Sequence, residues 1–395
     1  MIILPDDVTY LLNILNRNGH QAFVVGGCVR DMLLGREPYD WDIATSASPP
    51  EIKKCFPHSF DTGIAHGTVT VVYGKRNYEV TTYRTDGVYS DGRRPDSVTF
   101  TGSLTEDLAR RDFTMNAIAY HPAAGIVDPF LGKIDLQNKL IRCVGRPILR
   151  FSEDALRMLR AVRFSGQLGF TIERDTRRAI QKNAAGLRRV SVERVRDELT
   201  KLMLSPFSEK IKYISELGLI EYFPVDYPPT KQELEHAAQT LKNCSKKIIL
   251  VYAVLFYNRE PEFVLRSMRA LRFDNNSVRD TSRLIKIAKS PIMNDDYNLR
   301  KFLSANQDLF NEVFELRRLF GRDEGDKPRR CTAIIANGDC LHVKDLCVNG
   351  KDLLNIGLNG KEIGDVLARM LDIVLRDPTL NTKDKLLRSV LKCSL

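Results

Sequence analysis

The sequence predicts an α+β fold, with an α/β head at the N-terminus and a helical remainder. The first observation is that helix-like and strand-like stretches alternate from about residue 1 to about residue 140. The second is that nearly every periodic stretch after about residue 150 repeats at helical spacing. The third is the length of 395 residues, which by itself favours roughly two to three domains.

The head is expected to begin with two helices around a short buried strand, followed by a hairpin. Helical spacing and a terminating Gly35 predict helices over Val8–Asn18 and Val29–Leu34, with a strand between them at Ala22–Val25. Two runs of β-branched and aromatic residues, separated by four turn residues, predict hairpin strands over Thr68–Tyr73 and Tyr78–Arg84. The segment Asp86–Pro95 is rich in Gly, Asp and Arg and predicts a loop.

Helical periodicity dominates the rest of the chain, with Gly, Pro or Ser between the periodic stretches. Individual helices are predicted over Glu153–Leu168, Glu173–Asn183, Val192–Leu204, Ile211–Leu217 and Val366–Leu375. Between Lys231 and Leu319 the helical spacing continues without any cluster of chemically distinctive residues.

Composition narrows the class of partner and the compartment. The net charge of +10 favours a polyanion, either nucleic acid or nucleotide. About eighteen consecutive apolar residues occur nowhere, and the segment Met1–Asp7 is acidic rather than basic, so neither a membrane span nor a signal peptide is predicted. Eight irregularly spaced cysteines without a C-x-x-C motif indicate reduced thiols. We therefore expect a cytoplasmic protein.

A double glycine forms the first candidate site. Gly26 and Gly27 end the expected strand and lead into a helix, so backbone N–H groups there can approach an anion. Arg30 would add a bidentate contact to phosphate. A purely structural turn is the alternative.

A pair of carboxylates follows about ten residues later. If the stretch is extended, Asp40 and Asp42 point to the same side and can reach one divalent ion. Such a pair suits Mg²⁺, which keeps coordination positions for water and substrate phosphates. Glu79 in the second hairpin strand could meet them across a sheet and complete a metal site. A solvated acidic loop, and a surface-facing Glu79 paired with a basic neighbour, are the alternatives.

The pattern of polar and apolar residues around residue 155 predicts a helix whose polar side could contact a nucleotide base. Ser152 is expected to be its N-cap, and Glu153, Asp154, Arg157 and Arg160 fall within an arc of about 120° on its polar side. The side chain of a further arginine, Arg163, lies in the apolar arc and would have to extend outward to reach a phosphate.

An aspartate and an arginine one turn apart can distinguish bases. Asp154 can accept from the exocyclic amine of cytosine or adenine while Arg157 donates to a ring nitrogen or to O2 of cytosine, whereas uracil and guanine present the reversed polarity. A surface salt bridge on an exposed helix is the alternative.

These segments together resemble the class II tRNA nucleotidyltransferases and bacterial poly(A) polymerases. The matching motifs, in the family's order, are Gly26–Gly35 with Asp40–Thr45, Arg110–Ala117, Asp128–Leu136, Arg150–Arg157 and Glu193–Leu199. The resemblance implies that Arg111, Asp112 and Asn116 contact the ribose; a helix-ending cap is the structural alternative for Asp112. It covers about half the chain, roughly residues 22–205.

The resemblance also implies a domain order and an activity. The order is a polymerase β-like nucleotidyltransferase head at 1–138, a base-recognition neck at 139–205, a helical body at 206–290 and a tail at 291–395 that binds the tRNA elbow. The implied activity is template-independent, Mg²⁺-dependent addition of C, C and A to tRNA from CTP and ATP, with a homodimer as one candidate assembly and no membrane partner. The full-length 86–95 loop disfavours a CC-only enzyme.

Three other functions stay open at this point. The first two are an enzyme that adds only the terminal A and a poly(A) polymerase, against which stands the lack of a long basic terminal extension. The third, from a different class, is an inactive RNA-binding paralogue. Against it, both Asp40 and Asp42 are present.

Overall fold

The computed structural model describes residues 3–87, 89 and 97–391 and divides into two compact units. The first unit comprises Met1–Lys242 with Arg266–Phe273, and the second comprises Asn243–Leu265 with Asp274–Leu395. The loop expected over Asp86–Pro95 lies almost entirely outside the described residues. Each unit has its own core and is described separately.

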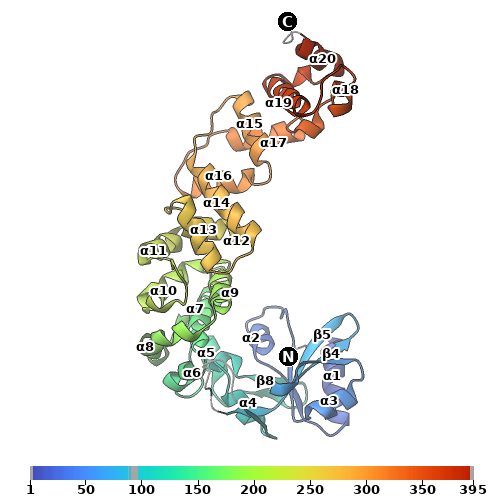
Figure 1. The fold of residues 1–395 in the computed structure, drawn as a ribbon. Coiled ribbons are helices and arrows are strands. Elements are labelled where there is room, and N and C mark those ends of the chain that lie inside the picture. Colours follow the sequence, from blue (N-terminus) through green and yellow to red (C-terminus); the bar gives the residue numbers. More distant parts are fainter. Residues whose placement is uncertain (1–2, 88, 90–96, 392–395) are drawn as a thin grey trace. The chain divides into compact units, whose positions relative to one another are not determined.

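A seven-stranded mixed sheet organises the head (Figure 1). Its strands, in spatial order, are β3 (Ser59–Gly63), β4 (Thr68–Tyr73), β5 (Arg76–Thr82), β2 (Asp42–Thr45), β1 (Ala22–Val25), β8 (Ala119–His121) and β9 (Gly125–Val127). Only the β2–β5 pair is parallel, and its register places Asp42 beside Glu79. A separate two-stranded sheet pairs β6 (Arg84–Asp86) with β7 (Val98–Phe100).

Five short helices accompany the sheet: α1 (Asp6–Arg17), α2 (Gly27–Leu33), α3 (Pro49–Cys55), α4 (Leu104–Ala109) and α5 (Gly132–Gln137). Helix α1 buries Val8, Leu11, Leu12 and Leu15, which recur at the spacing of one helical face. It packs against β1 and α3 (Figure 1). Helix α3 begins with a capping box between Ser48 and Glu51 and with proline at its first turn, which together define its start.

The expected α+β fold is confirmed, and two predicted strands have the observed bounds, Ala22–Val25 and Thr68–Tyr73. The second hairpin strand begins at Arg76, two residues before the predicted start. The reason is a tight turn at Gly74 and Lys75, in which Gly74 has a φ of 61°. A shorter turn leaves Arg76 and Asn77 free to pair with β4.

The helical part of the first unit includes a small parallel sheet, in which β10 (Leu140–Ile141) precedes the helices and β11 (Thr171–Ile172) lies between α7 and α8. Its helices are α6 (Pro147–Glu153), α7 (Leu156–Leu168), α8 (Arg174–Asn183), α9 (Val192–Met203), α10 (Tyr213–Glu216) and α11 (Lys231–Thr240). Helix α7 is buried along most of its length and packs against α9.

The prediction of one helix from Glu153 to Leu168 with Ser152 as its N-cap is wrong. Ser152 lies inside α6, and its hydroxyl donates to the carbonyl of Leu149 at 2.8 Å. Asp154 is extended, with φ −141° and ψ 105°, and its Oδ1 accepts from the N–H of Leu156 at 3.0 Å. The aspartate side chain competes for the backbone and so separates α6 from α7.

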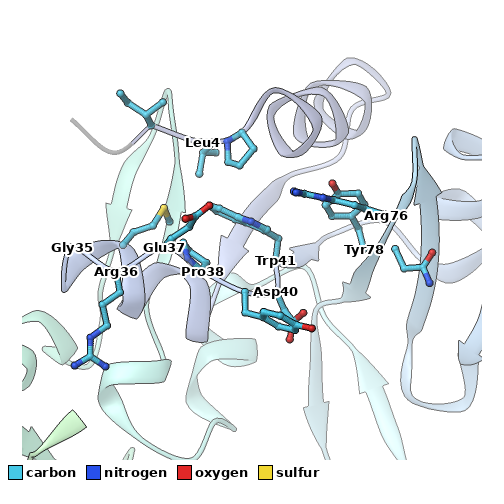
Figure 2. Close-up of a pocket in the computed structure, with 14 residues that line it drawn as sticks. Leu4, Gly35, Arg36, Glu37, Pro38, Asp40, Trp41, Arg76 and Tyr78 are labelled. Atoms are coloured by element: carbon cyan, nitrogen blue, oxygen red, sulfur yellow. The ribbon is translucent and has the colours of Figure 1, made fainter. Parts of the chain in front are cut away.

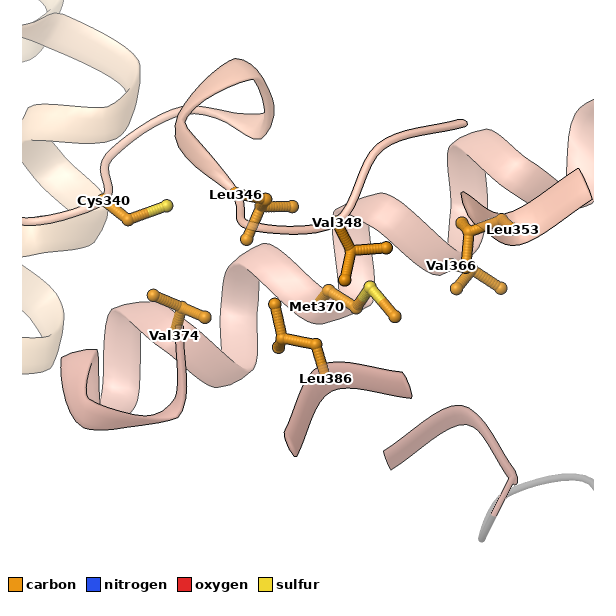
Figure 3. Packing of buried hydrophobic residues seen from close by; sticks show 8 residues of the cluster. All are labelled: Cys340, Leu346, Val348, Leu353, Val366, Met370, Val374 and Leu386. Carbon is orange, nitrogen blue, oxygen red and sulfur yellow. The ribbon is translucent and has the colours of Figure 1, made fainter. Parts of the chain in front are cut away.

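The described residues of the second unit form helices joined by turns and loops. Its helices are α12 (Ile248–Leu255), part of α13 (Pro261–Ala270), α14 (Asn275–Lys289), α15 (Asp296–Asn306), α16 (Phe310–Leu319), α17 (Lys327–Ala336), α18 (Gly350–Leu354), α19 (Lys361–Arg376) and α20 (Lys383–Leu391). Figure 3 shows one of its cores, to which α19 contributes Val366, Met370 and Val374; the other members are Cys340, Leu346, Val348, Leu353 and Leu386. The predicted helix Val366–Leu375 is therefore part of a longer one. Among the described helices, none has the length and apolar character needed to cross a bilayer.

Candidate active site

A cavity of about 450 Å³ brings five segments of the first unit together. It is lined by the turn after β1 with α2, by the first residue of β2, by the segment between α4 and β8, by Asp154 with α7, and by one residue of α9. From the head come Gly26, Gly27, Arg30, Asp42, Arg110, Arg111, Asp112 and Asn116, and from the helical part Asp154, Leu156, Arg157, Arg160, Phe164 and Arg194. Ten of the residues predicted from sequence therefore share one cavity.

The double-glycine turn is shaped by a close approach to Arg111. Gly26 has φ 78°, and a Cβ there would lie 2.6 Å from Nη1 of Arg111. Its N–H donates to the carbonyl of Ile118 at 3.0 Å. The positive φ favours glycine at this position, and a side chain there would also displace the Arg111 guanidinium.

The acidic pair lies at the edge of this cavity. Asp42, which lines it, is partly buried, whereas Asp40 is exposed and lines a different cavity. Burial raises the pKa of the Asp42 carboxyl above its ordinary value; the Arg111 guanidinium opposes the rise, and the carboxylates of Glu79 and Asp40 add to it. The carboxyl of Asp42 is therefore close enough to both Glu79 and Asp40 to respond to their charge.

A divalent cation fits this donor set. Within the described part of the chain, no three His, Cys, Asp or Glu side chains converge closely enough to hold a metal by themselves. Mg²⁺ needs only one or two carboxylates when phosphates and water supply the remaining oxygens. Burial and the charges of Glu79 and Asp40 raise the pKa of the Asp42 carboxyl, and a bound cation would favour its ionised form.

A continuous polar network crosses the cavity from α7 to α2. Arg160 donates from Nε and Nη2 to Oδ2 of Asp112 at 2.9 and 2.7 Å. Oδ1 of Asp112 accepts from Nδ2 of Asn116 at 3.0 Å, and Oδ1 of Asn116 accepts from Nη1 of Arg30 at 2.8 Å. Arg30 also donates to Asp31 at 2.9 and 3.0 Å. The network fixes the side chains predicted to contact ribose and phosphate.

Asp112 is the acidic centre of that network. Its burial raises the pKa of the carboxyl, but Arg160 and the hydrogen bonds from Asn116 and Arg160 outweigh burial and lower the pKa to about 2. Asp112 is therefore ionised at neutral pH and holds Arg160 in position.

The two predicted base-reading residues are also held by partners. Asp154 accepts a two-point contact from Arg194 of α9, with Nη2 to Oδ2 at 2.8 Å and Nη1 to Oδ1 at 3.3 Å. Arg157 pairs with Glu153 and donates to the carbonyls of Arg150 at 3.0 Å and Arg110 at 3.2 Å. Both side chains line the cavity in fixed orientations.

Four predicted residues lie outside the lining of this cavity: Asp40, Glu79, Glu153 and Arg163. Arg163 does not extend outward, which its side chain would have to do to reach a phosphate. It is buried, pairs with Glu198 and Gln167, and lies 3.9 Å from the centre of the Phe164 ring. Burial of this guanidinium is tolerated because Glu198 on α9 neutralises it. Glu153 contacts the cavity only through Arg157.

Three supporting residues were not singled out from sequence. Asp107 is fully buried and binds Arg110 at 2.7 Å and Arg111 at 3.4 Å, so it orients two arginines of the lining. Phe164 has the guanidinium of Arg30 at 5.2 Å and that of Arg160 at 5.4 Å from its ring centre. Arg194 fixes Asp154. Asp107 could have been identified from sequence, because it lies three and four positions before Arg110 and Arg111, the spacing of ion pairs on a helix. Arg194 could not, because its partner Asp154 is distant in sequence.

Comparison with protein-family models accounts for most of the chain. Residues 22–142 match the poly A polymerase head domain, residues 169–225 match an RNA and SrmB-binding site of polymerase A, and residues 244–390 match tRNA nucleotidyltransferase domain 2. The first match includes every head residue of the cavity.

Individual relatives agree with these models. The chain is 38% identical to the CCA-adding enzyme of Lactobacillus helveticus over 95% of this chain and 94% of that protein. It is 55% identical to the enzyme of the same name from Geobacillus thermodenitrificans over 53% of this chain and 52% of that protein. The crystal structure of the Bacillus stearothermophilus CCA-adding enzyme in complex with CTP superposes with a TM-score of 0.84 at 33% identity, covering 99% of both chains.

Proposed function

The chain belongs to the family of CCA-adding tRNA nucleotidyltransferases, and from this premise we propose that it adds C, C and A to the 3′ end of tRNA. The reaction joins the RNA 3′-hydroxyl to the α-phosphorus of CTP or ATP and releases pyrophosphate. The observation that carries the proposal is the single cavity in which Asp42 lies with Asp154 and Arg157. A base selected there has its triphosphate beside the acidic pair.

The cavity divides into three binding regions. Gly26, Gly27 and Arg30 would contact the triphosphate, together with Arg160, which reaches the lining from α7. Arg111, Asp112 and Asn116 would contact the ribose, because a polar group satisfied only by the 2′-hydroxyl distinguishes ribose from deoxyribose. Arg163 is the weakest of the phosphate candidates, since Glu198 already occupies its guanidinium.

Asp154 and Arg157 select the base. Asp154 accepts from N4 of cytosine or N6 of adenine, and Arg157 donates to the ring edge of either base. Their partners Arg194 and Glu153 hold this donor and acceptor pattern in place before a nucleotide binds. Because these side chains are already ordered, little conformational entropy is lost when a nucleotide binds. Uracil and guanine present the reversed donor and acceptor pattern, so their polar groups would stay unpaired.

Members of the nucleotidyltransferase family generally use divalent metal ions, and here the ion is proposed to be Mg²⁺. Asp40 and Asp42 would hold it, with Glu79 as an additional carboxylate beside Asp42. When bound, Mg²⁺ lowers the pKa of the attacking hydroxyl and neutralises charge on the phosphates. Arg111 contributes a fixed positive charge next to Asp42.

The wider organisation follows the same family. Residues 1–138 form the catalytic head, 139–205 the base-recognition neck, 206–290 the body and 291–395 the tail that binds the tRNA elbow. The enzyme is proposed to act in the cytoplasm, in keeping with the free cysteines of its described part. Light scattering of the purified chain would test the homodimer.

The proposal is tested with three tRNA transcripts that end before the first terminal C, after the first C and after the second C. Each is incubated with CTP alone, ATP alone or both, and products are separated by length. We expect addition of C, C and A in order and then arrest. A ladder of adenylates would indicate a poly(A) polymerase, and extension of only the third transcript would indicate an A-adding enzyme; both would contradict the proposal.

A further inference from the structure

Three guanidiniums of the first unit lie over one aromatic ring, that of Phe164 on α7. The Cζ atoms of Arg163, Arg30 and Arg160 are 3.9, 5.2 and 5.4 Å from the ring centre. All three are within the distance of about 6 Å at which a ring attracts a cation. Each guanidinium also has a carboxylate partner: Asp31 for Arg30, Asp112 for Arg160 and Glu198 for Arg163. Three ion pairs therefore converge on one ring.

Two connections bring the guanidiniums of the cavity lining to this ring. Arg160 precedes Phe164 by four residues, so the two side chains are neighbours on the surface of α7. Arg30 comes from α2 and is linked to Arg160 through Asn116 and Asp112. The polar network that crosses the cavity thus begins and ends with a guanidinium over the ring of Phe164, and the ring closes the network.

The ring itself is fixed by burial. Phe164 is 4% exposed, and its ring meets that of the fully buried Phe113 edge to face, with centroids 5.8 Å apart and planes at 84°. This T-shaped arrangement is one that aromatic pairs prefer. Phe164 nevertheless belongs to the cavity lining, as do Arg30 and Arg160. The ring can therefore hold these two guanidiniums where a nucleotide would meet them.

The larger cavity of the head shows the contrast. Its volume is about 1140 Å³, and Arg36 and Arg76 lie at opposite ends of its lining (Figure 2). Arg36 is exposed, and the Arg76 side chain is 69% exposed. Distance and solvent keep these positive charges apart. At Phe164 the guanidiniums are brought together in a largely buried place, which is unfavourable unless the surroundings compensate their charge.

A ring and a carboxylate stabilise a guanidinium in different ways. A carboxylate takes up N–H donors, as Asp112 does with Nε and Nη2 of Arg160 at 2.9 and 2.7 Å. Attraction to a ring acts on the charge and needs no N–H directed at the ring. Nη1 of Arg160 makes no hydrogen bond within the described part of the chain. Its donors therefore stay available for phosphate oxygens, which arginine binds through its planar set of N–H groups.

We propose that Phe164 is the positioning residue for the arginines that bind the triphosphate, because its ring holds the guanidiniums of Arg30 and Arg160 together in the cavity lining. The inference rests on the proposed function, since it concerns how the nucleotide of that reaction is held. Loss of the ring weakens phosphate binding and leaves base selection, which depends on Asp154 and Arg157, unchanged.

Steady-state kinetics of Phe164→Leu test the role of the ring. This variant keeps an apolar side chain, and it is expected to raise the KM for CTP and the inhibition constant of inorganic pyrophosphate about tenfold, the effect of losing the attraction between a ring and two guanidiniums. The ratio of kcat/KM for CTP over UTP should stay unchanged. Phe170→Leu is the matched control, because Phe170 is 3% exposed and no guanidinium lies over its ring among the described residues. It should leave both constants unchanged.

Fluorinated phenylalanines at position 164 separate the charge effect from packing. Fluorine withdraws π-electron density from the ring, while the shape and apolar character of the ring change little. Binding of pyrophosphate, measured by calorimetry without divalent cation, should weaken stepwise from the mono- to the di- to the trifluorinated ring, because the attraction of a cation follows that density. The same series at position 170 should show no trend.

The outcomes separate this inference from the proposed function. Stepwise weakening at position 164 alone supports the inference, even if Phe164→Leu does not fold. Equal pyrophosphate affinity across the series, an equal loss at position 170, or a lower preference of Phe164→Leu for CTP over UTP would overturn the inference, while CCA addition by the unmodified enzyme would leave the function intact. Failure of the unmodified enzyme to add any nucleotide would instead overturn the proposed function.

Discussion

The cavity that contains Asp154 and Arg157, called the nucleotide cavity below, differs in its charge pairing from the acidic edge formed by Asp40, Asp42 and Glu79. In the cavity, acidic and basic side chains are already paired: Arg160 with Asp112, Arg194 with Asp154 and Arg157 with Glu153. At the edge, Asp40 and Glu79 are exposed, and the pKa of Asp42 is raised by burial and by its acidic neighbours.

The difference separates recognition from catalysis. Recognition needs a fixed arrangement of donors and acceptors, and ion pairs within the protein supply it before the substrate arrives. Catalysis needs negative charge that a bound cation can compensate, and at the edge burial and two neighbouring carboxylates outweigh the Arg111 guanidinium and keep the pKa of Asp42 raised. Substitutions in the two regions should therefore fail in different ways.

The largest effect is expected from removing the acidic pair. Asp40→Ala combined with Asp42→Ala should lower incorporation of CTP and ATP about a thousandfold or more, since several kcal/mol of transition-state stabilisation disappear. Binding of tRNA, measured by filter retention, should stay nearly unchanged. Asp61→Ala, an exposed carboxylate on β3, is the control. Retained turnover in the double variant would show that the acidic edge is not the catalytic centre.

A smaller effect, on the stability of the fold, should follow when the ion pair between Asp112 and Arg160 is removed. Asp112→Asn should lower the free energy of unfolding at pH 7 by about 2 kcal/mol, measured by urea denaturation, because an ionised carboxylate with a pKa of about 2 is removed. A depressed pKa stabilises the fold above about pH 4 and loses that effect as the pH falls through about 2. The difference from the unmodified protein should therefore shrink below about pH 4.

The exposed Asp175 provides the comparison for that measurement. Asp175→Asn on α8 should leave stability at pH 7 nearly unchanged, because surface ion pairs contribute little. If Asp112→Asn were equally silent, Asp112 would not hold the network together.

The base-reading pair should affect selectivity. Asp154→Ala with Arg157→Ala should reduce the preference for CTP and ATP over UTP and GTP by roughly ten- to a hundredfold, since a good bidentate contact discriminates by about 1–3 kcal/mol. The ratio of kcat/KM values among the four nucleotides measures it. Asp175→Ala with Arg178→Ala removes a pair with the same sequence spacing from the surface of α8 and should leave the ratio unchanged. Undiminished selectivity in the first variant would remove these residues from base recognition.

The smallest effect on activity is expected from substitution of Glu79. This substitution tests whether Glu79 belongs to the metal site. Glu79→Gln should raise the Mg²⁺ concentration for half-maximal activity about tenfold or less, with the rate at saturating Mg²⁺ nearly unchanged, because two of three carboxylates remain. Asp61→Asn again serves as the control. An unchanged Mg²⁺ requirement would place Glu79 outside the metal site and narrow the acidic edge to Asp40 and Asp42.

The sequence by itself determined the α+β class and seven of the residues that line the cavity, and the resemblance to the family added Arg111, Asp112 and Asn116. It did so because short-range signals report directly on local structure: the glycines of the β1–α2 turn, the period-two strands and the apolar face of α1 each need only their neighbours in the chain. The order of the sequence motifs along the chain indicated the family.

Tertiary structure alone decided which charges pair. Asp154 breaks the expected helix and takes Arg194 of α9 as its partner, and Arg163 turns inward to Glu198, 35 residues away. The parallel pairing of β2 with β5, which brings Glu79 beside Asp42, also joins distant segments. A charged side chain that is buried loses its hydration and is stable only when an opposite charge lies beside it. Helical periodicity carries no information about which residue supplies that charge.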